Sequence, residues 1–204
     1  MDIASIQSQS TTKEKILYTA AMLFAKNGYE DISMRDLADA VGIRVSSLYN
    51  HFASKKEILS ALYGAYDTER QQSRPDMDGL LRLAETAPPR ELLWRSSQYS
   101  SPSIANIMDR IIATATRQIS SDADSAAFVK RNLLDPWPLF LKPLLTRMTE
   151  LDRIEPIDID ALSFLVSVYS FGGTALNNSS MEISRDAWAK GYALLCSLVN
   201  PTGK

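Results

Sequence analysis

The stretch GIRVSSLYNHFASKKEIL, residues 42–59, decides the fold. Its first half holds a short helical segment, VSSLYNHF. In its second half Ser54 stands three residues before Glu57, the spacing of a capping box that opens a longer helix. Just upstream, Ser33 and Asp36 form a capping pair that opens the short helix SMRDLADAV, which Gly42 ends. Two short helices joined by a tight turn that contains glycine predict a helix-turn-helix.

Two longer helices are predicted on either side of this pair. In residues 12–27 the apolar residues recur at intervals of three and four, the spacing of one helical face, and Gly28 follows as a stop. Residues 55–72 carry a similar apolar face. Residues 1–10 are rich in Ser and Gln and contain no Lys or Arg, so they are predicted to be flexible, without a groove-binding role.

The rest of the chain is organised differently, because all nine prolines lie at or after Pro75. Its periodicity stays helical, and no segment shows sustained strand alternation. We therefore predict an all-α fold, with an N-terminal three-helix helix-turn-helix head and a C-terminal helical domain. The predicted divisions are a flexible arm at 1–11, the helix-turn-helix domain at 12–54, a connecting helix at 55–72 and the helical domain at 73–204.

Two segments near the C-terminus predict an interface between subunits. Residues 157–176 are apolar on nearly every face, and a helix of that kind must be covered on all sides. Residues 184–199 carry a stripe of apolar residues that can pack beside it. We expect a homodimer held by a four-helix bundle between the two copies.

Composition excludes several classes of site. The formal net charge of −2 gives no global sign of nucleic-acid binding, but residues 42–56 contain three cations and no Asp or Glu. Cys196 is the only cysteine and His51 the only histidine, which leaves few groups for a disulfide, a nucleophile-base pair or a metal site. No segment is predicted to span a membrane or to act as a signal peptide, so we expect a cytoplasmic protein that needs no metal or cofactor and is not an enzyme.

Residues 12–66 resemble the DNA-binding head of the tetracycline-repressor (TetR) family. The resemblance is carried by the pair Gly28-Tyr29, the helix from Ser33 to Ala38, and the pattern from Gly42 to Leu59. Val45 and Ser46 precede a serine, Ser47, where the family often has Gly or Ala. The resemblance implies a transcription regulator whose C-terminal domain dimerises and binds a ligand.

The predicted DNA-binding residues belong mostly to the second helix of the pair, which enters the major groove in such motifs. Arg44 is expected to bind a guanine, Asn50 an adenine and Val45 a thymine methyl group. By resemblance, Tyr49 and His51 contact phosphates, and Ser33 and Lys55 do so at helix starts. The full set is Ser33, Arg44, Val45, Ser46, Ser47, Tyr49, Asn50, His51 and Lys55.

Bulky residues downstream are predicted to line an apolar ligand pocket, with ordinary core packing as the alternative for each. They are Trp94, Tyr99, Met108, Ile111, Ile112, Trp137, Phe140, Phe164 and Tyr169.

The sequence thus predicts a homodimeric repressor that a small hydrophobic or aromatic ligand releases from a near-palindromic DNA operator. One alternative is a constitutive DNA-binding regulator without small-molecule control. The other is a helical ligand-binding enzyme, against which the scarcity of His and Cys argues.

Overall fold

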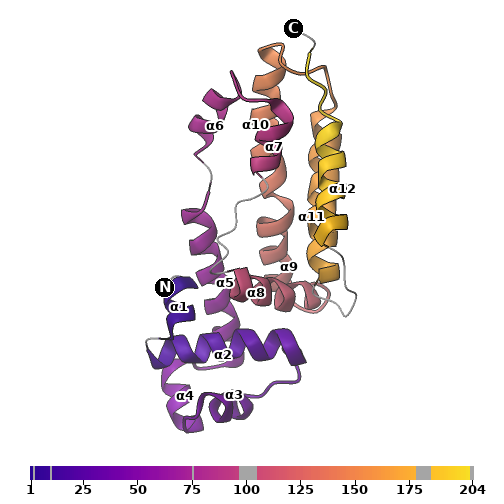
Figure 1. Ribbon diagram of the computed structural model, residues 1–204. Helices are drawn as coiled ribbons and strands as arrows, with labels where there is room; N and C mark the ends of the chain where they lie inside the picture. Colours follow the sequence, from indigo (N-terminus) through magenta and orange to yellow (C-terminus); the bar gives the residue numbers. More distant parts are fainter. Residues whose placement is uncertain (2, 10, 75, 97–104, 178–184, 203–204) are drawn as a thin grey trace. The chain divides into compact units, whose positions relative to one another are not determined.

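The computed structural model describes residues 1, 3–9, 11–74, 76–96, 105–177 and 185–202 (Figure 1). Across these ranges the regular elements are helices, and the only strand-like pairing is an isolated bridge between Ile154 and Pro201. The all-α prediction is confirmed. The chain divides into two compact units: unit 1 comprises residues 1–73 and 100–128, and unit 2 comprises residues 74–99 and 129–204.

In unit 1 the central element is α2, which packs against α1, α3, α5 and α8. Figure 1 shows it between α8 and the pair formed by α3 and α4. The helices of this unit are α1 (Ile3–Ser8), α2 (Thr12–Asn27), α3 (Met34–Val41), α4 (Val45–His51), α5 (Lys55–Gln72), α8 (Ala105–Arg117) and all but the last residue of α9 (Ala123–Val129). Unit 1 thus combines the N-terminal segment up to residue 73 with residues 100–128, whereas the sequence predicts that every residue from 73 onward belongs to one C-terminal domain.

Local capping explains where the head helices begin. Ser33 Oγ accepts a hydrogen bond from Asp36 N (3.2 Å), and Asp36 Oδ2 accepts one from Ser33 N (2.8 Å), which completes a capping box. Ser54 caps α5 in a variant of this arrangement, because Glu57 accepts from Ala53 N. Each such cap satisfies amide groups that have no partner within the helix.

The N-terminal residues differ from the expected flexible arm. Residues 3–8 form α1, and both Ile3 and Ile6 are fully buried against the helices of unit 1. The spacing of three between these two isoleucines puts them on one helical face, and burial of that face offsets the entropy of ordering a polar segment. The Ser and Gln content conceals this apolar face.

The segment after α8 is attached to α5 by a small polar network. Asp122 Oδ2 accepts hydrogen bonds from Ser125 N (2.8 Å) and Ser125 Oγ (2.6 Å), and Tyr63 Oη lies 2.8 Å from Ser125 Oγ. The hydrogen bond from the Ser125 hydroxyl is the main cause that lowers the pKa of Asp122. Lys56 Nζ is 3.0 Å from Asp124 and 3.8 Å from Asp122. The network therefore holds α9 on α5.

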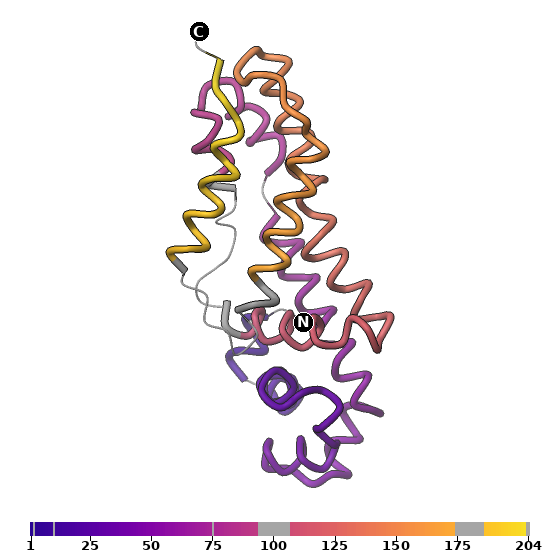
Figure 2. The backbone as a smooth tube through the Cα atoms, turned by 90° about the vertical axis from the view of Figure 1, so that its right-hand side faces the viewer, coloured from indigo at the N-terminus to yellow at the C-terminus, as the bar shows by residue number. Residues whose placement is uncertain are grey.

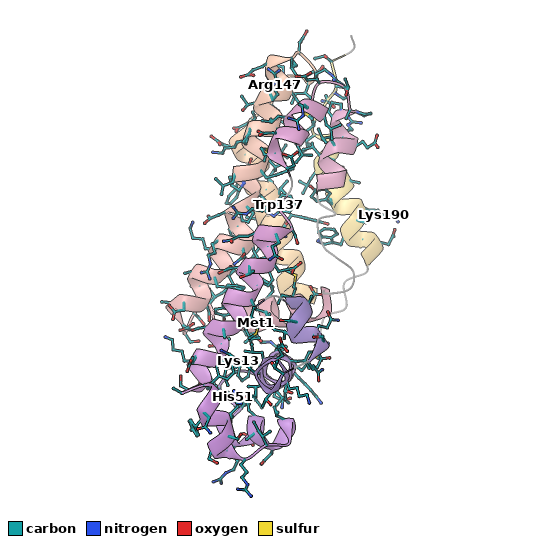
Figure 3. The ribbon with its side chains drawn as sticks, turned by 90° about the vertical axis from the view of Figure 1, so that its left-hand side faces the viewer. Met1, Lys13, His51, Trp137, Arg147 and Lys190 are labelled. Carbon is teal, nitrogen blue, oxygen red and sulfur yellow. The ribbon has the colours of Figure 1, made fainter. Side chains whose placement is uncertain are left out.

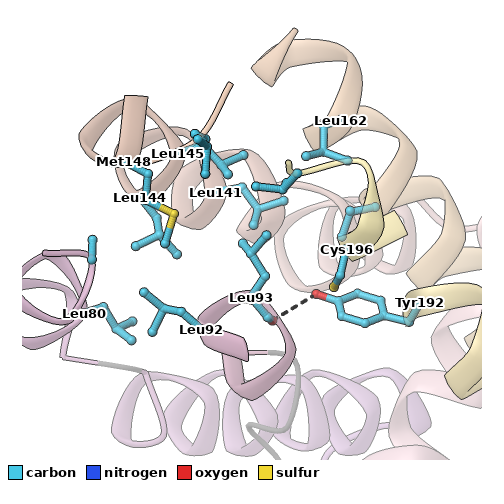
Figure 4. Packing of buried hydrophobic residues seen from close by; sticks show 14 residues of the cluster. Leu80, Leu92, Leu93, Leu141, Leu144, Leu145, Met148, Leu162, Tyr192 and Cys196 are labelled. Carbon is cyan, nitrogen blue, oxygen red and sulfur yellow. Dashed lines mark hydrogen bonds between the residues drawn. The ribbon is translucent and has the colours of Figure 1, made fainter. Parts of the chain in front are cut away.

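Unit 2 is a helical bundle in which α10, α11 and α12 run side by side (Figure 2). Its helices are α6 (Met77–Leu83), α7 (Pro89–Ser96), the π-helix η1 (Lys130–Leu134), α10 (Pro136–Glu150), α11 (Ile159–Asn177) and α12 (Arg185–Ser197). Leucines from α6, α7, α10 and α11 fill its core, and Tyr192 of α12 donates a hydrogen bond to Leu93 O (3.4 Å; Figure 4). The apolar faces of these five helices thus pack together to form the core.

At the junction of η1 and α10, one backbone carbonyl lacks its usual helical donor. Pro138 has no amide hydrogen, so a helix continuing through it cannot supply the usual donor for the carbonyl of Leu134. Ser167 Oγ of α11 lies 3.1 Å from that carbonyl, and it also donates to Ser163 O at the shorter distance of 2.8 Å. The single hydroxyl hydrogen is therefore shared between a carbonyl of its own helix and the carbonyl of Leu134, and the second contact ties α11 to the junction.

Throughout the described ranges, no helix combines the length and the apolar character that a membrane span requires.

Candidate nucleic-acid interface

Helix α4 buries one face and exposes the other. Leu48 (0% exposed) and Phe52 (2%) hold it to the head, whereas Tyr49 is 51% exposed. The side chains of Ser46 and Asn50 also face solvent. This is the arrangement that base readout requires, because the packing residues alternate with polar residues free to meet a groove.

The start of α4 carries an exposed cation. Arg44 occupies the N-cap position and makes no capping hydrogen bond with its side chain. Val45, Ser47 and His51 are half-buried, so they offer less surface than their neighbours. Of the predicted base-reading residues, Arg44 has the longest reach and a fork of donors suited to a guanine edge.

The hydroxyl of Ser33, by contrast, is occupied within the protein. It donates to Asp36 Oδ2 (2.6 Å) and accepts from Asp36 N. The hydrogen bond from this hydroxyl, followed by that from the Ser33 amide, lowers the pKa of Asp36. Ser33 is therefore first of all a cap, and a phosphate contact requires it to share its hydroxyl.

The ammonium of Lys55 also has partners within the head. Lys55 Nζ donates to Tyr29 O (2.6 Å) and to Glu30 O (3.3 Å), and it lies 4.2 Å from the centroid of the Tyr29 ring. The ammonium that was predicted to contact a phosphate is thus already hydrogen-bonded to two backbone carbonyls of the head.

Two residues near this surface were missed in the sequence. Lys13 Nζ lies 5.2 Å from the centroid of the Phe52 ring, beside the end of α4, and Figure 3 labels Lys13 and His51 in the same part of unit 1. The second is Tyr29, whose ring centroid lies 4.2 Å from Lys55 Nζ. The contacts of Lys13 with Phe52 and of Tyr29 with Lys55 each join residues far apart in sequence, so no local spacing signals them.

The predicted ligand-lining residues are divided between the two units. Ile111 and Ile112 are buried and Met108 is half-buried in unit 1. In unit 2, Phe140 packs against the core, whereas Phe164 is 66% exposed on α11. The side chain of Trp94 and the whole of Tyr99 lie outside the described residues.

The other two, Trp137 and Tyr169, belong to an aromatic group in unit 2 with Trp188 and Tyr192. Ring centroids in this group lie 5.7 to 6.5 Å apart, and Trp188 stacks on Tyr192 at an interplanar angle of 13°. Tyr169 Oη donates to Trp188 O (2.5 Å). The rings pack on one another, so this group closes the contact between α11 and α12.

Two spaces are found among the described residues of unit 2, and the one in its core is small. A cavity of about 10 Å³ is lined by Leu93, Leu141, Leu162, Val166, Tyr192, Leu195 and Cys196. That is room for about one water molecule, whereas ligand sites usually hold ~300–1,000 Å³. An open hollow of about 300 Å³ lies where Pro89, Leu151–Arg153, Pro201 and Thr202 meet. Of the seven predicted ligand residues whose side chains the structure describes, none lines either space.

Cys196 has the environment of a core residue. Burial raises the pKa of its thiol to about 11, so the thiolate needed for nucleophilic attack is scarce at neutral pH. Among the described residues, no cluster of His, Cys, Asp and Glu is placed to bind a metal ion.

Comparisons with known proteins match both the head and the wider chain. Residues 16–62 match the family model described as bacterial regulatory proteins, tetR family. The chain is 31% identical over 169 residues to the transcriptional repressor KstR of Rhodococcus jostii, an alignment that covers 72% of this chain and 78% of KstR. It is 42% identical over 53 residues to the repressor KstR2 of Mycobacterium tuberculosis, which covers only 26% of either protein.

Solved structures extend the likeness of fold over almost the whole chain. The ketosteroid transcriptional regulator KstR2 of M. tuberculosis superposes with a TM-score of 0.63 at 21% identity, covering 94% of this chain and 96% of that one. The TetR-family regulator PfmR of Thermus thermophilus gives a TM-score of 0.59 at 23% identity over 92% and 96% of the two chains.

Proposed function

This chain belongs to the TetR family of bacterial regulatory proteins, and we propose that it is a transcriptional repressor that binds a near-palindromic operator as a homodimer. The family consists of regulators rather than enzymes, and both named relatives from the sequence comparison are repressors. The head of this chain carries the matched segment, so DNA binding is assigned to unit 1.

The observation that carries the proposal is the polar face of α4. Arg44, Ser46, Tyr49 and Asn50 are all exposed on a helix that Leu48 and Phe52 anchor. In the proposed complex the N-terminal part of α4 enters the major groove, where Arg44 reads a guanine and Asn50 an adenine. Tyr49 and His51 contact the DNA backbone, with Ser33 at the start of α3. Val45 contacts a thymine methyl group, and Ser46 and Ser47 lie with it among the residues that meet base edges.

A selection of bound sequences from a random duplex library, at two salt concentrations, tests this function. We expect enrichment of an inverted repeat, and an affinity that falls as salt rises because counterions are released from the DNA. Weak binding to every sequence, without enrichment, would contradict the assignment of the head as a sequence reader.

The homodimer is supported by an exposed apolar face on α11 and α12. Large apolar side chains on these helices, and one directly after α12, are 46–70% exposed: Phe164, Leu165, Val168, Leu194 and, after α12, Leu198. A soluble monomer rarely leaves so many on adjacent helices, and a second copy of the same face would cover them by two-fold symmetry. Two heads would then address two half-sites of an inverted repeat.

Control by a small hydrophobic or aromatic ligand is the finer part of the proposal. In its favour, KstR2 is named a ketosteroid regulator and this chain carries many aromatic residues in unit 2. The constitutive regulator is a second candidate, favoured by the small cavity in the unit 2 core. Displacement of the protein from its selected operator by members of a steroid and aromatic-acid library separates the two: release supports the ligand-controlled form, and unchanged affinity up to ligand saturation supports the constitutive form.

A further inference from the structure

Lys55 is the first residue of α5, yet its ammonium is directed at the turn between α2 and α3. Two backbone carbonyls and one ring face surround it: Tyr29 O at 2.6 Å, Glu30 O at 3.3 Å and the Tyr29 ring centroid at 4.2 Å. An ammonium has three hydrogens to donate, and a cation over an aromatic face is attracted by the ring quadrupole. The protein itself thus supplies acceptors for most of this group.

Lys55 and its partners lie at opposite ends of the helix-turn-helix. Tyr29 and Glu30 precede α3, and Lys55 follows α4, so the contact closes a loop that contains both helices. The Tyr29 ring packs edge-on against Phe24 at 5.1 Å, and Phe24 is fully buried in the core of the head. The ammonium is therefore held by a part of the head that cannot easily move.

We propose that Lys55 is a positioning residue for base readout, whose ammonium fastens the two ends of the helix-turn-helix to each other. It acts through α4, by fixing the direction in which Arg44 and Asn50 project, and it does not neutralise a DNA phosphate. This assignment rests on the proposed DNA-binding function, and it replaces the phosphate contact predicted for Lys55 from its place at the start of a helix.

The two roles have opposite thermodynamic signatures. A lysine that neutralises a phosphate contributes about one unit to the salt slope of binding, equally on all sequences. A lysine that orients α4 leaves the slope unchanged, because no counterion release depends on it. Its loss lowers affinity for the operator selectively, since a misdirected helix loses contacts with base edges but keeps those with the backbone.

The test uses the full-length protein and the operator obtained from the library selection. Lys55→Met removes the charge and the donors, Tyr29→Leu removes the ring face but alters no charge, and Lys56→Gln is the matched control. Lys56 is the next residue on α5, its side chain is 63% exposed, and it pairs with Asp122 and Asp124 outside the loop. Affinity for the operator and for a random duplex is measured over a range of salt concentrations, with a thermal melt of each variant.

We expect Lys55→Met to lower operator affinity about tenfold, with little change in random-duplex affinity or in the salt slope. Tyr29→Leu should lower the ratio of operator to random affinity in the same direction, and Lys56→Gln should leave that ratio unchanged. Equal losses on both duplexes with a slope smaller by about one would overturn the proposal and restore the phosphate contact. An unchanged ratio in both Lys55→Met and Tyr29→Leu would also overturn it.

Two outcomes separate this proposal from the function on which it rests. If the wild-type chain selects no operator, the DNA-reading function fails, whatever the role of Lys55. If Lys55→Met melts below the assay temperature, Tyr29→Leu decides, because it retains every charge and both carbonyl acceptors.

Discussion

Successive residues of α4 have opposite environments, and this alternation sets what each can do. Leu48 is fully buried while Tyr49, its neighbour, is 51% exposed. Arg44 is exposed at the N-cap and makes no capping hydrogen bond, whereas the ammonium of Lys55 is held by two carbonyls. We therefore expect different roles for these two cations of one motif, because one is held inside the head and the other projects toward solvent.

At this scale the first prediction concerns Arg44. Arg44→Ala should relax discrimination at a single base pair, at a cost of about 1–3 kcal/mol, or roughly 5- to 150-fold, because one bidentate contact to guanine is lost. Competition binding with operators substituted at each position measures this. Arg35→Ala, which removes an exposed arginine of α3, is the control expected to lose affinity without a change at any one base. A uniform loss across all positions for Arg44→Ala would show that this residue contacts the backbone.

A second prediction concerns pH. The pKa of Asp122 is lowered chiefly by the Ser125 hydroxyl, so its ionised form stabilises the folded state. That contribution is complete above the unfolded-state pKa, near the ordinary value of 3.8, and is lost as pH falls through the lower folded-state value. Asp122→Asn should therefore lower Tm at pH 7, and the difference from wild type should shrink below about pH 4. Asp39→Asn, an exposed substitution on α3, is the control; a difference that grows in acid would contradict the assigned sign.

Local capping residues decide where the helices begin, and buried apolar faces decide where the helices pack. Ser33 and Ser54 start their helices through bonds to residues three positions away. In α1, by contrast, polar residues outnumber the large apolar ones, and the helix exists because Ile3 and Ile6 enter the core of unit 1. A helix of six residues is too short to be stable alone, so packing decides that it forms.

Ile6→Ala should consequently destabilise the protein by about 2–5 kcal/mol, the usual cost of truncating a buried isoleucine. Chemical denaturation monitored by circular dichroism gives this value, and Gln7→Ala on the exposed side of α1 is the matched control. If residues 3–8 were a flexible arm, neither substitution would change the free energy of unfolding, and that result would contradict the prediction.

The junction of η1 and α10 offers a test by double substitution. Ser167→Ala should cost about 1–3 kcal/mol, because the Leu134 carbonyl loses the hydroxyl that it shares with the Ser163 carbonyl. In a Pro138→Ala background the cost should be smaller, since the alanine introduced there supplies an amide hydrogen to the same carbonyl. Equal costs in both backgrounds would mean that Ser167 acts through packing alone.

In the whole molecule, unit 2 leaves apolar surface that its own residues do not cover. Leu194 is 70% exposed on α12 and Phe164 is 66% exposed on α11. The proposed dimer uses this surface. It also explains why α11, which lies in the segment predicted to be apolar on nearly every face, is not fully buried within one chain.

Leu194→Glu should therefore convert the protein to a single-chain species in sedimentation at micromolar concentration, and it should weaken operator binding by at least about tenfold as the second head is lost. Leu139→Glu is the matched control, because Leu139 is 72% exposed on α10, outside the proposed interface. A monomeric wild-type chain, or a dimer that survives Leu194→Glu, would contradict this interface.

The sequence alone determined the features that depend on neighbours three or four residues apart. The helices from α2 to α5 lie where capping pairs, apolar periodicity and glycine stops predict them, and the face of α4 that carries Arg44 and Asn50 follows from the positions of Leu48 and Phe52. The pattern from Gly42 to Leu59 also indicated the family. These features are local, so a linear pattern records them.

Only the tertiary structure decided which distant groups meet. Lys55 finds carbonyls 26 and 25 residues away, Ser167 finds one 33 residues away, and Ile6 is buried by helices from other parts of unit 1. The assignment of residues 100–128 to unit 1 and the closing of the unit 2 core are of the same kind. Such contacts arise because folding satisfies backbone acceptors and fills space with whichever side chains arrive there, and no spacing along the chain encodes that outcome.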